Sequence, residues 1–92
     1  MGVEMGWEWD PDKAKENRQK HGVDFADTIG VFYDEQAILE EDEGYEGEQR
    51  FRKIGMDFLG RLLVVIYTYR GENIRLISAR KATKKEAGQY YA

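Results

Sequence analysis

Arginines and lysines cluster where the most apolar part of this chain ends. The stretch RLISARKATKKE, residues 75 to 86, contains five of them, at Arg75, Arg80, Lys81, Lys84 and Lys85. Arginine can bond a phosphate group through two parallel N–H groups, and it keeps its charge at any physiological pH. The cluster therefore indicates either a phosphate-binding edge or a strand that reaches water before a solvated helix begins.

The net charge of −4 hides an uneven distribution of charge along the chain. Residues 34 to 48 hold eight acids and no base, whereas residues 49 to 92 hold ten bases and three acids. The C-terminal half is thus a cationic surface suited to an anionic partner. The acidic run is either a solvated loop or a segment that faces a partner or shields the cationic surface.

Composition narrows the class of protein. A chain of 92 residues predicts a single domain, 1–92, in which residues 1–6 form a loose N-terminal tail. Cysteine is absent, which rules out disulfides and thiolate zinc sites, and no Gly-rich phosphate loop, nucleophile elbow or metal-ligand spacing occurs. The longest apolar stretch, residues 62–67, is far shorter than the roughly 20 residues of a membrane span, and no N-terminal leader is evident. We therefore expect a soluble cytoplasmic protein with no cofactor, no metal and no membrane contact.

Two helices are predicted in the first third of the chain. A short aromatic strand, WEWD, precedes the first helix, which begins at the capping Asp10 with Pro11 in the first helical position and ends at Gly22. The second helix starts from Asp24, and its apolar residues recur at i, i+4 and i+7, at Phe25, Ile29 and Phe32. This spacing predicts a helical hairpin with Gly22 as its hinge.

The second half of the chain predicts a sheet. Strands are expected at RFRKIGMD (50–57), RLLVVIYTY (61–69) and NIRLISAR (73–80), joined by the short turns FLG and RGE as an antiparallel meander. The middle strand is apolar on both faces and should be central and buried. Thr83 and Glu86 form a capping box that begins a C-terminal helix. The predicted fold class is α+β, with two N-terminal helices packed on a mainly antiparallel β-sheet.

The spacing of two arginines sets a geometric condition. Arg75 and Arg80 are five residues apart, so a straight strand would place them on opposite faces of the sheet. They can converge on one phosphate only if the strand bulges or bends at Ser78 or Ala79. Without such a bend, an arginine on an exposed sheet face is usually a solubilising residue.

Several separated motifs occur in an order that resembles one family. WDPDKAKENRQKHGVDF, a Tyr–Asp pair after the second helix, EGEQRF, GRLLVVIYTYRGENIRLISARKAT and a closing helix are similar to the BrnT toxins, from about residue 7 to 90. These toxins are ribonucleases of type II toxin–antitoxin modules, related in fold to RelE. The resemblance implies an mRNA-cleaving toxin. It also implies a hetero-oligomer with a BrnA-like ribbon-helix-helix antitoxin that neutralises it.

The resemblance also implies roles for individual residues. Metal-free RNA cleavage requires a base for the 2′-hydroxyl, an acid for the 5′-leaving oxygen, and cations around the phosphorane. The family pattern favours Arg50, Arg75 and Arg80 as the cations. Glu48 is either a catalytic base beside Arg50 or half of a surface salt bridge, and His21 either caps the first helix or acts in catalysis. Further RNA contacts are expected from Lys20, Arg52, Lys81 and Tyr45.

The sequence departs from the family at one position. Many relatives carry a histidine before the Glu-x-Arg motif, where this chain has Gly44 with Tyr45 beside it. Acid–base chemistry would then fall to Tyr45, Glu48 or His21. Two functions follow: a metal-independent endoribonuclease toxin, or a toxin-like binding module that holds its antitoxin or RNA with little or no catalysis. Growth arrest on expression without antitoxin, lost on Arg80→Ala, would separate them.

Overall fold

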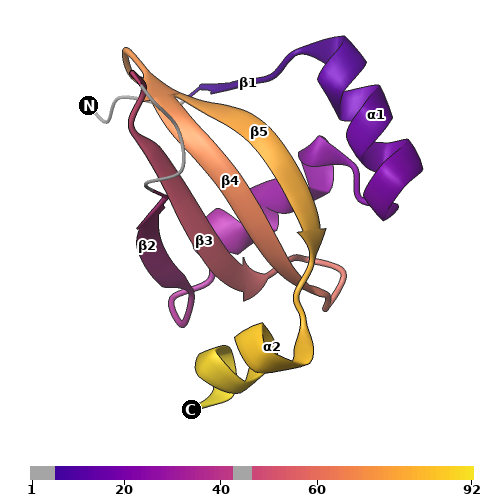
Figure 1. Cartoon of the computed structure of the whole chain (residues 1–92), viewed down its shortest axis with the longest axis vertical. Helices are drawn as coiled ribbons and strands as arrows, with labels where there is room; N and C mark the ends of the chain where they lie inside the picture. The colour runs from indigo at the N-terminus through magenta and orange to yellow at the C-terminus, as the bar shows by residue number, and fades with distance from the viewer. Residues whose placement is uncertain (1–5, 43–46) are drawn as a thin grey trace.

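A five-stranded mixed β-sheet forms the centre of the molecule (Figure 1). The computed structural model describes residues 6–42 and 47–92. The strand order is β1-β5-β4-β3-β2, in which β1 pairs parallel with β5 and the other pairings are antiparallel. The strands are β1 Trp7–Glu8, β2 Ile38–Asp42, β3 Arg50–Met56, β4 Leu62–Arg70 and β5 Asn73–Lys81. The three strands predicted in the second half and the α+β class are confirmed.

Three helices accompany the sheet: α1 (Pro11–His21), the 3₁₀ helix η1 (Phe25–Tyr33) and α2 (Lys84–Tyr91). The ends of α1 are as predicted, because Asp10 accepts a hydrogen bond from the Asp12 N–H and Gly22 adopts a left-handed φ of 69°. The capping box of α2 is also present. Among the helices of the described part of the chain, none is long and apolar enough to cross a membrane.

The second predicted helix is a 3₁₀ helix, which corrects the expectation of a regular α-helical hairpin. Two local contacts favour the tighter form. The Thr28 hydroxyl donates to the carbonyl of Phe25 three residues earlier, at 2.6 Å. At Gly30, a Cβ atom would stand 2.6 Å from the backbone nitrogen of Phe58, so this turn lies directly against the β3–β4 turn.

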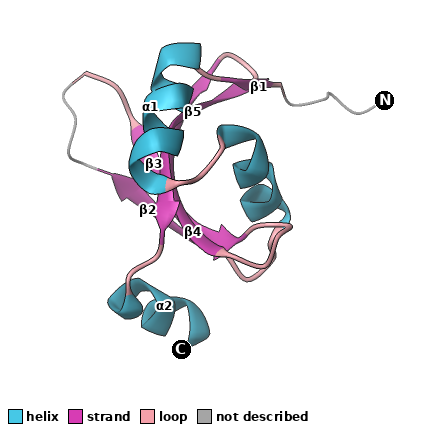
Figure 2. Cartoon of the chain, turned by 90° about the vertical axis from the view of Figure 1, so that its right-hand side faces the viewer, coloured by secondary structure: helices cyan, strands magenta, loops and turns pink. Residues whose placement is uncertain are grey.

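The main hydrophobic core lies between the sheet and the segment formed by α1 and η1. Figure 1 shows η1 behind the sheet and α1 beside β5, whereas Figure 2 shows α2 standing apart from both. The central strand β4 contributes to both faces, and its Val64 and Val65 are 1% and 0% exposed, as predicted. The core cluster consists of Val23, Phe25, Val31, Leu63, Val65, Tyr67, Ile74, Leu76 and Ala79.

A buried asparagine fixes α1 against β5. The Asn17 side chain donates to the carbonyls of Val23 and Ala79, at 3.0 and 2.8 Å, and accepts from the Ala79 N–H at 3.0 Å. Asn17 is only 7% exposed. One side chain therefore sets the position of the whole helix relative to the strand that carries Arg75.

Asn17→Ala should lower the free energy of unfolding by about 2 kcal/mol, because buried backbone groups would lose their partners. Urea unfolding followed by tryptophan fluorescence measures this change. The matched control is Gln19→Ala, which removes an exposed amide from the same helix. Equal stability of the two variants would show that these hydrogen bonds do not hold α1 in place.

Part of the acidic run is a strand rather than a loop. Residues 38–42 form β2 at the edge of the sheet, where Glu40 pairs with Arg52 and Asp42 pairs with Arg50 across to β3. The Arg52 guanidinium approaches the Glu40 carboxylate at 2.6 Å. Opposite charges directly across two strands stabilise their pairing, so these acidic side chains help to hold β2 on β3.

A β-bulge at Ile77 changes which face β5 presents. Ile66 pairs with Ser78, but the next residue, Tyr67, pairs with Leu76. Ile77 is therefore the extra residue, next to the expected Ser78. Ile74, Leu76 and Ala79 are buried in the core cluster, so Arg75 and Arg80 share the opposite face. Their Cα atoms still stand roughly 15 Å apart at about 3.3 Å per strand residue.

Candidate functional site

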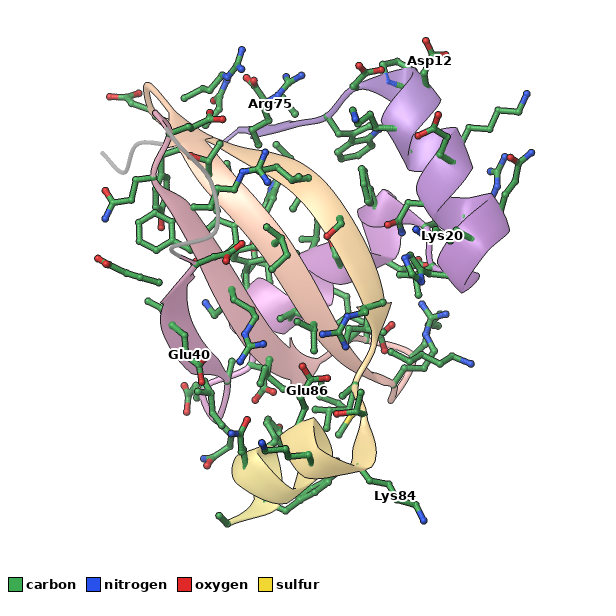
Figure 3. The ribbon with its side chains drawn as sticks, viewed as in Figure 1. Asp12, Lys20, Glu40, Arg75, Lys84 and Glu86 are labelled. Carbon is green, nitrogen blue, oxygen red and sulfur yellow. The ribbon has the colours of Figure 1, made fainter. Side chains whose placement is uncertain are left out.

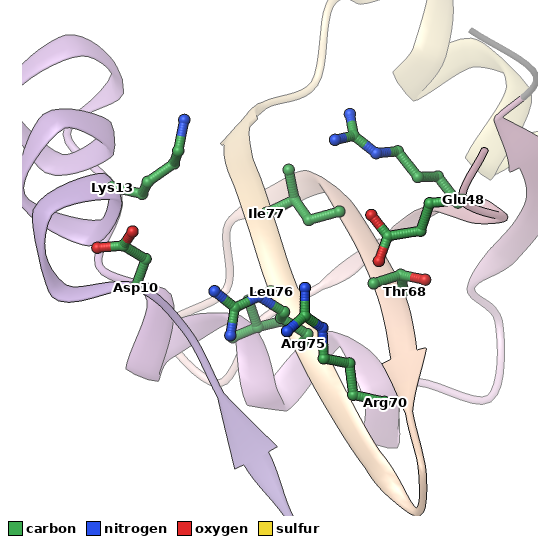
Figure 4. Close-up of a pocket in the computed structure, with 9 residues that line it drawn as sticks. Asp10, Lys13, Glu48, Thr68, Arg70, Arg75, Leu76 and Ile77 are labelled. Carbon is green, nitrogen blue, oxygen red and sulfur yellow. The ribbon is translucent and has the colours of Figure 1, made fainter. Parts of the chain in front are cut away.

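A cationic pocket of about 190 Å³ opens on the face of the sheet that is opposite the core. It lies near the β4–β5 hairpin, and Figure 4 shows Asp10 and Lys13 of α1 on one side and Glu48 and Thr68 on the other. Four bases against two acids favour an anionic ligand. The lining residues are Asp10, Lys13, Glu48, Arg50, Thr68, Arg70, Arg75, Leu76 and Ile77.

Strand pairing brings the two expected arginines together. Arg75 of β5 pairs with Thr68 of β4, while Phe51 of β3 pairs with Tyr67, so that Arg50 lies beside Thr68 on the other side. The Thr68 hydroxyl donates to the carbonyl of Gln49 at 2.6 Å. The central strand thus places Arg50 and Arg75 on its two flanks, and the chain just before β3 carries Glu48 to the same pocket.

Arg75 is held in place from the neighbouring strand. Its guanidinium lies 3.1 Å from a carboxylate oxygen of Glu8, which pairs with Arg75 across the parallel β1–β5 ladder. The other oxygen of Glu8 accepts from the Asn73 amide at 3.1 Å. These two hydrogen bonds, that from Asn73 first, lower the pKa of Glu8. Glu8 stays ionised and orients Arg75, whose label in Figure 3 marks this end of the sheet.

Arg80 lies elsewhere, which corrects the expected convergence with Arg75. It binds Glu86 of α2 through two hydrogen bonds of 2.7 and 2.8 Å. Arg52 lies 3.5 Å from the same carboxylate and 2.6 Å from Glu40. The hydrogen bond from Arg80, followed by that from the Thr83 backbone N–H, lowers the pKa of Glu86 to about 2. We call this arrangement of Glu40, Arg52, Arg80 and Glu86 the α2 clamp.

His21 and Lys20 line a second pocket, of about 180 Å³, together with Lys13, Glu16, Asn17, Ile77 and Ser78. Lys13 and Ile77 belong to both pockets, so the surface of α1 continues the cationic pocket toward the end of the helix. His21 also occupies the last turn of α1, as the capping interpretation requires. The structure therefore places His21 beside the cationic pocket rather than within it.

A third pocket, of about 290 Å³, adjoins the cationic pocket on its other side. Glu48 and Thr68 line both of them. We call it the aromatic pocket, and its lining residues are Gly47, Glu48, Gln49, Phe51, Thr68 and Tyr69. Lys81, proposed as an RNA contact, is exposed at the end of β5 and lines none of the three pockets. Gly44 and Tyr45 lie outside the described residues.

Sequence reasoning missed Lys13 and Arg70 as lining residues of the cationic pocket. A signal for Lys13 existed, because Lys13 and Lys20 are seven residues apart and so share one face of α1. Arg70 was assigned to a turn but is the last residue of β4, paired with Asn73. In the described part of the chain, no group of three or more His, Asp or Glu residues is arranged to hold a metal ion.

The fold belongs to a known class of ribonuclease toxins. The crystal structure of the Brucella abortus ribonuclease toxin BrnT, at 1.1 Å resolution, matches with a TM-score of 0.69 and 27% sequence identity. The match covers 88% of this chain and 100% of the Brucella chain. The family model described as "Ribonuclease toxin, BrnT, of type II toxin-antitoxin system" matches residues 9–86, so this chain belongs to the BrnT family. No curated protein sequence matches it. The resemblance identified from the sequence motifs is confirmed.

Proposed function

We propose that this chain is an endoribonuclease toxin that cleaves mRNA in the cationic pocket without a metal ion. The observation that carries the proposal is the meeting of Arg50, Arg75 and Glu48 in one cavity. Membership of a ribonuclease toxin family supports it. Arginines on both flanks of the central strand can bind the scissile phosphate. Of the two carboxylates that line the pocket, Asp10 caps α1, which leaves Glu48 as the candidate base.

In the proposed reaction Glu48 removes the proton from the 2′-hydroxyl, and the resulting oxygen attacks phosphorus. The 2′-O–P bond forms, the P–O5′ bond breaks, and a 2′,3′-cyclic phosphate results. Arg50 and Arg75 stabilise the extra negative charge on the phosphorane. The leaving 5′-oxygen takes its proton from water, because His21 lines the adjoining pocket and not the one that holds the scissile phosphate.

Glu48→Gln should reduce RNA cleavage by about 10²- to 10⁴-fold, because loss of a general base has that effect. Cleavage is measured in EDTA with a fluorescent single-stranded RNA. Glu35→Gln, which alters an exposed acid far from Glu48 in the sequence, is the matched control and should leave the rate unchanged. Cleavage that needs a divalent cation, or that survives Glu48→Gln, would contradict the proposed mechanism.

We further propose that the partner is a BrnA-like ribbon-helix-helix antitoxin that covers the cationic pocket. A cationic surface on so small a domain attracts both RNA and a competitor that carries acids or apolar anchors, and apolar contacts would hold such a competitor when salt screens the charges. Co-expression with the neighbouring gene should give a hetero-oligomer on gel filtration that persists in high salt and does not bind RNA. A chain that elutes alone at every salt concentration would rule out such an antitoxin. A cytoplasmic location and a relation in fold to RelE stay predictions.

The second candidate is a toxin-like binding module with little or no catalysis, favoured by the glycine in the histidine slot at residue 44. Growth arrest on expression without antitoxin distinguishes the two. The structure shifts the informative variant from Arg80→Ala to Arg75→Ala, because Arg80 holds α2. Arrest that is lost on Arg75→Ala supports the enzyme, whereas RNA binding without arrest or cleavage supports the binding module.

A further inference from the structure

We propose that the aromatic pocket is a subsite for one nucleobase of the RNA, with the ring of Tyr69 as its stacking surface. This inference rests on the proposed RNA cleavage in the cationic pocket. The aromatic pocket would contact a base near the scissile phosphate, whereas the arginines bind only the RNA backbone.

The ring of Tyr69 is 50% exposed and packs against two other aromatic rings. Its centroid lies 5.5 Å from that of Phe51 and 5.8 Å from that of Tyr67, with interplanar angles of 70° and 83°. Tyr67 beneath it is 2% exposed, and burial first, and then the neighbouring Tyr69, raise the pKa of Tyr67. Because these contacts restrict the ring, less conformational entropy is lost when a ligand stacks on it than on a fully exposed side chain.

The cationic and aromatic pockets adjoin at Glu48 and Thr68. A phosphate and its base are joined through a single sugar. The hydrogen bond from Thr68 to the Gln49 carbonyl fixes the wall between them. Thr68 faces the cationic pocket, whereas Tyr69 faces the core side with Tyr67 and Phe51. An RNA strand that bends past Glu48, around β4 just beyond the start of β3, can therefore place a base near the scissile phosphate on Tyr69.

The chemistry of the aromatic pocket fits a nucleobase better than an aliphatic side chain. A nucleobase combines a π face with a polar edge, and this pocket combines Tyr69 and Phe51 with Glu48 and Gln49. The Gln49 amide nitrogen donates to Glu41 at 3.0 Å, which orients the amide and leaves its carbonyl as an acceptor for a base amino group. An alkyl group would cover these polar atoms without replacing their hydrogen bonds to water.

The test uses a short single-stranded RNA that the protein cleaves, with 2′-deoxyribose at the scissile nucleotide to prevent reaction. A 2-aminopurine base is placed at each position around the cleavage site in turn. Stacking quenches its fluorescence, so we expect quenching by the wild-type protein at one position beside the scissile phosphate. Tyr69→Leu should abolish that quenching and weaken binding by about 5- to 100-fold, the range for loss of one stacked base.

Tyr69→Phe keeps the ring and should retain quenching. Tyr33→Leu removes another exposed tyrosine, which lines none of the three pockets, and should change neither quenching nor binding. An abasic nucleotide at the quenched position should weaken wild-type binding as much as Tyr69→Leu does, and combining both changes should weaken it no further. The abasic nucleotide tests the wild-type protein, so that comparison needs no folded variant. Additive losses, or quenching that persists in Tyr69→Leu, would overturn the subsite. Failure of the wild-type protein to bind or cleave RNA would instead overturn the proposed function.

Discussion

Arg75→Ala should slow RNA cleavage by about 10²- to 10³-fold, equivalent to about 2.7 to 4 kcal/mol of barrier, as for loss of an oxyanion-stabilising donor. Arg75 lies in the cationic pocket, and its guanidinium group is oriented by Glu8 at 3.1 Å before the phosphorane forms. The comparison is of kcat/KM for wild type and variant on one RNA substrate in EDTA.

Arg75→Ala should lower the cleavage rate while the protein stays folded. The Arg75–Glu8 pair is partly exposed, so its loss should lower the free energy of unfolding by no more than about 1 kcal/mol. Arg75→Lys keeps the charge but not the two parallel N–H groups, and should give an intermediate rate. Arg18→Ala removes an arginine whose side chain is 61% exposed and serves as the control. Unchanged turnover in Arg75→Ala would place the active site elsewhere on the molecule.

Arg80→Ala should instead destabilise the fold, by about 3 kcal/mol, because the buried carboxylate of Glu86 would lose the closest of its cationic partners. Glu86 is 8% exposed and would keep only the more distant interaction with Arg52, at 3.5 Å, besides its cap to Thr83. The expected loss lies at the low end of the range of about 3 to 5 kcal/mol for buried ion pairs, because the Arg80 side chain is 37% exposed. Urea unfolding measures the loss. Cleavage per folded molecule should be unchanged, and a rate loss at full stability would restore Arg80 to the catalytic set.

Acid should weaken the α2 clamp in the wild-type protein. The pKa of Glu86 falls from its ordinary value of 4.5 to about 2, chiefly through the hydrogen bond from Arg80. Its contribution to stability, at most about 3 kcal/mol, is complete above pH 4.5 and is lost as the pH falls toward 2. Arg80→Ala should show a flatter stability profile between those values. Parallel profiles for the two proteins would show that Glu86 does not carry the acid sensitivity.

The sequence alone predicts features that depend on residues close together in the chain. Asp10, Pro11 and Gly22 define α1, Thr83 and Glu86 begin α2, and the doubly apolar RLLVVIYTY is the central strand. The strand β2 was not predicted, because its acids were judged as a charge run in water. Only the pairing of Glu40 with Arg52 and Asp42 with Arg50 explains why the acids lie on a strand.

The site was predictable to the extent that it depends on strand neighbours. Glu48, Arg50 and Arg75 were named from their motifs, and all three line the cationic pocket. Arg80 was misplaced because its partner follows six residues later, on a helix whose direction the sequence does not specify. Lys13 was missed because it comes to the pocket through the packing of α1 on β5, a contact fixed by Asn17 across 62 positions of the chain.

The extra residue at Ile77 shifts the alternation of side chains between the two faces of the sheet along β5. Before the bulge, odd-numbered residues such as Arg75 point to the open face, and after it, even-numbered residues such as Arg80 do so. Regular pairing of the same residues, with Ile77 in the ladder, would turn either Arg75 or Arg80 to the core face, whereas deletion of Ile77 would leave the two arginines four positions apart and on one face. The pocket at one end of the strand and the α2 clamp at the other are thus compatible only because of a single out-of-register residue. Loss of the bulge at constant strand length would therefore separate nucleic-acid contact from helix attachment.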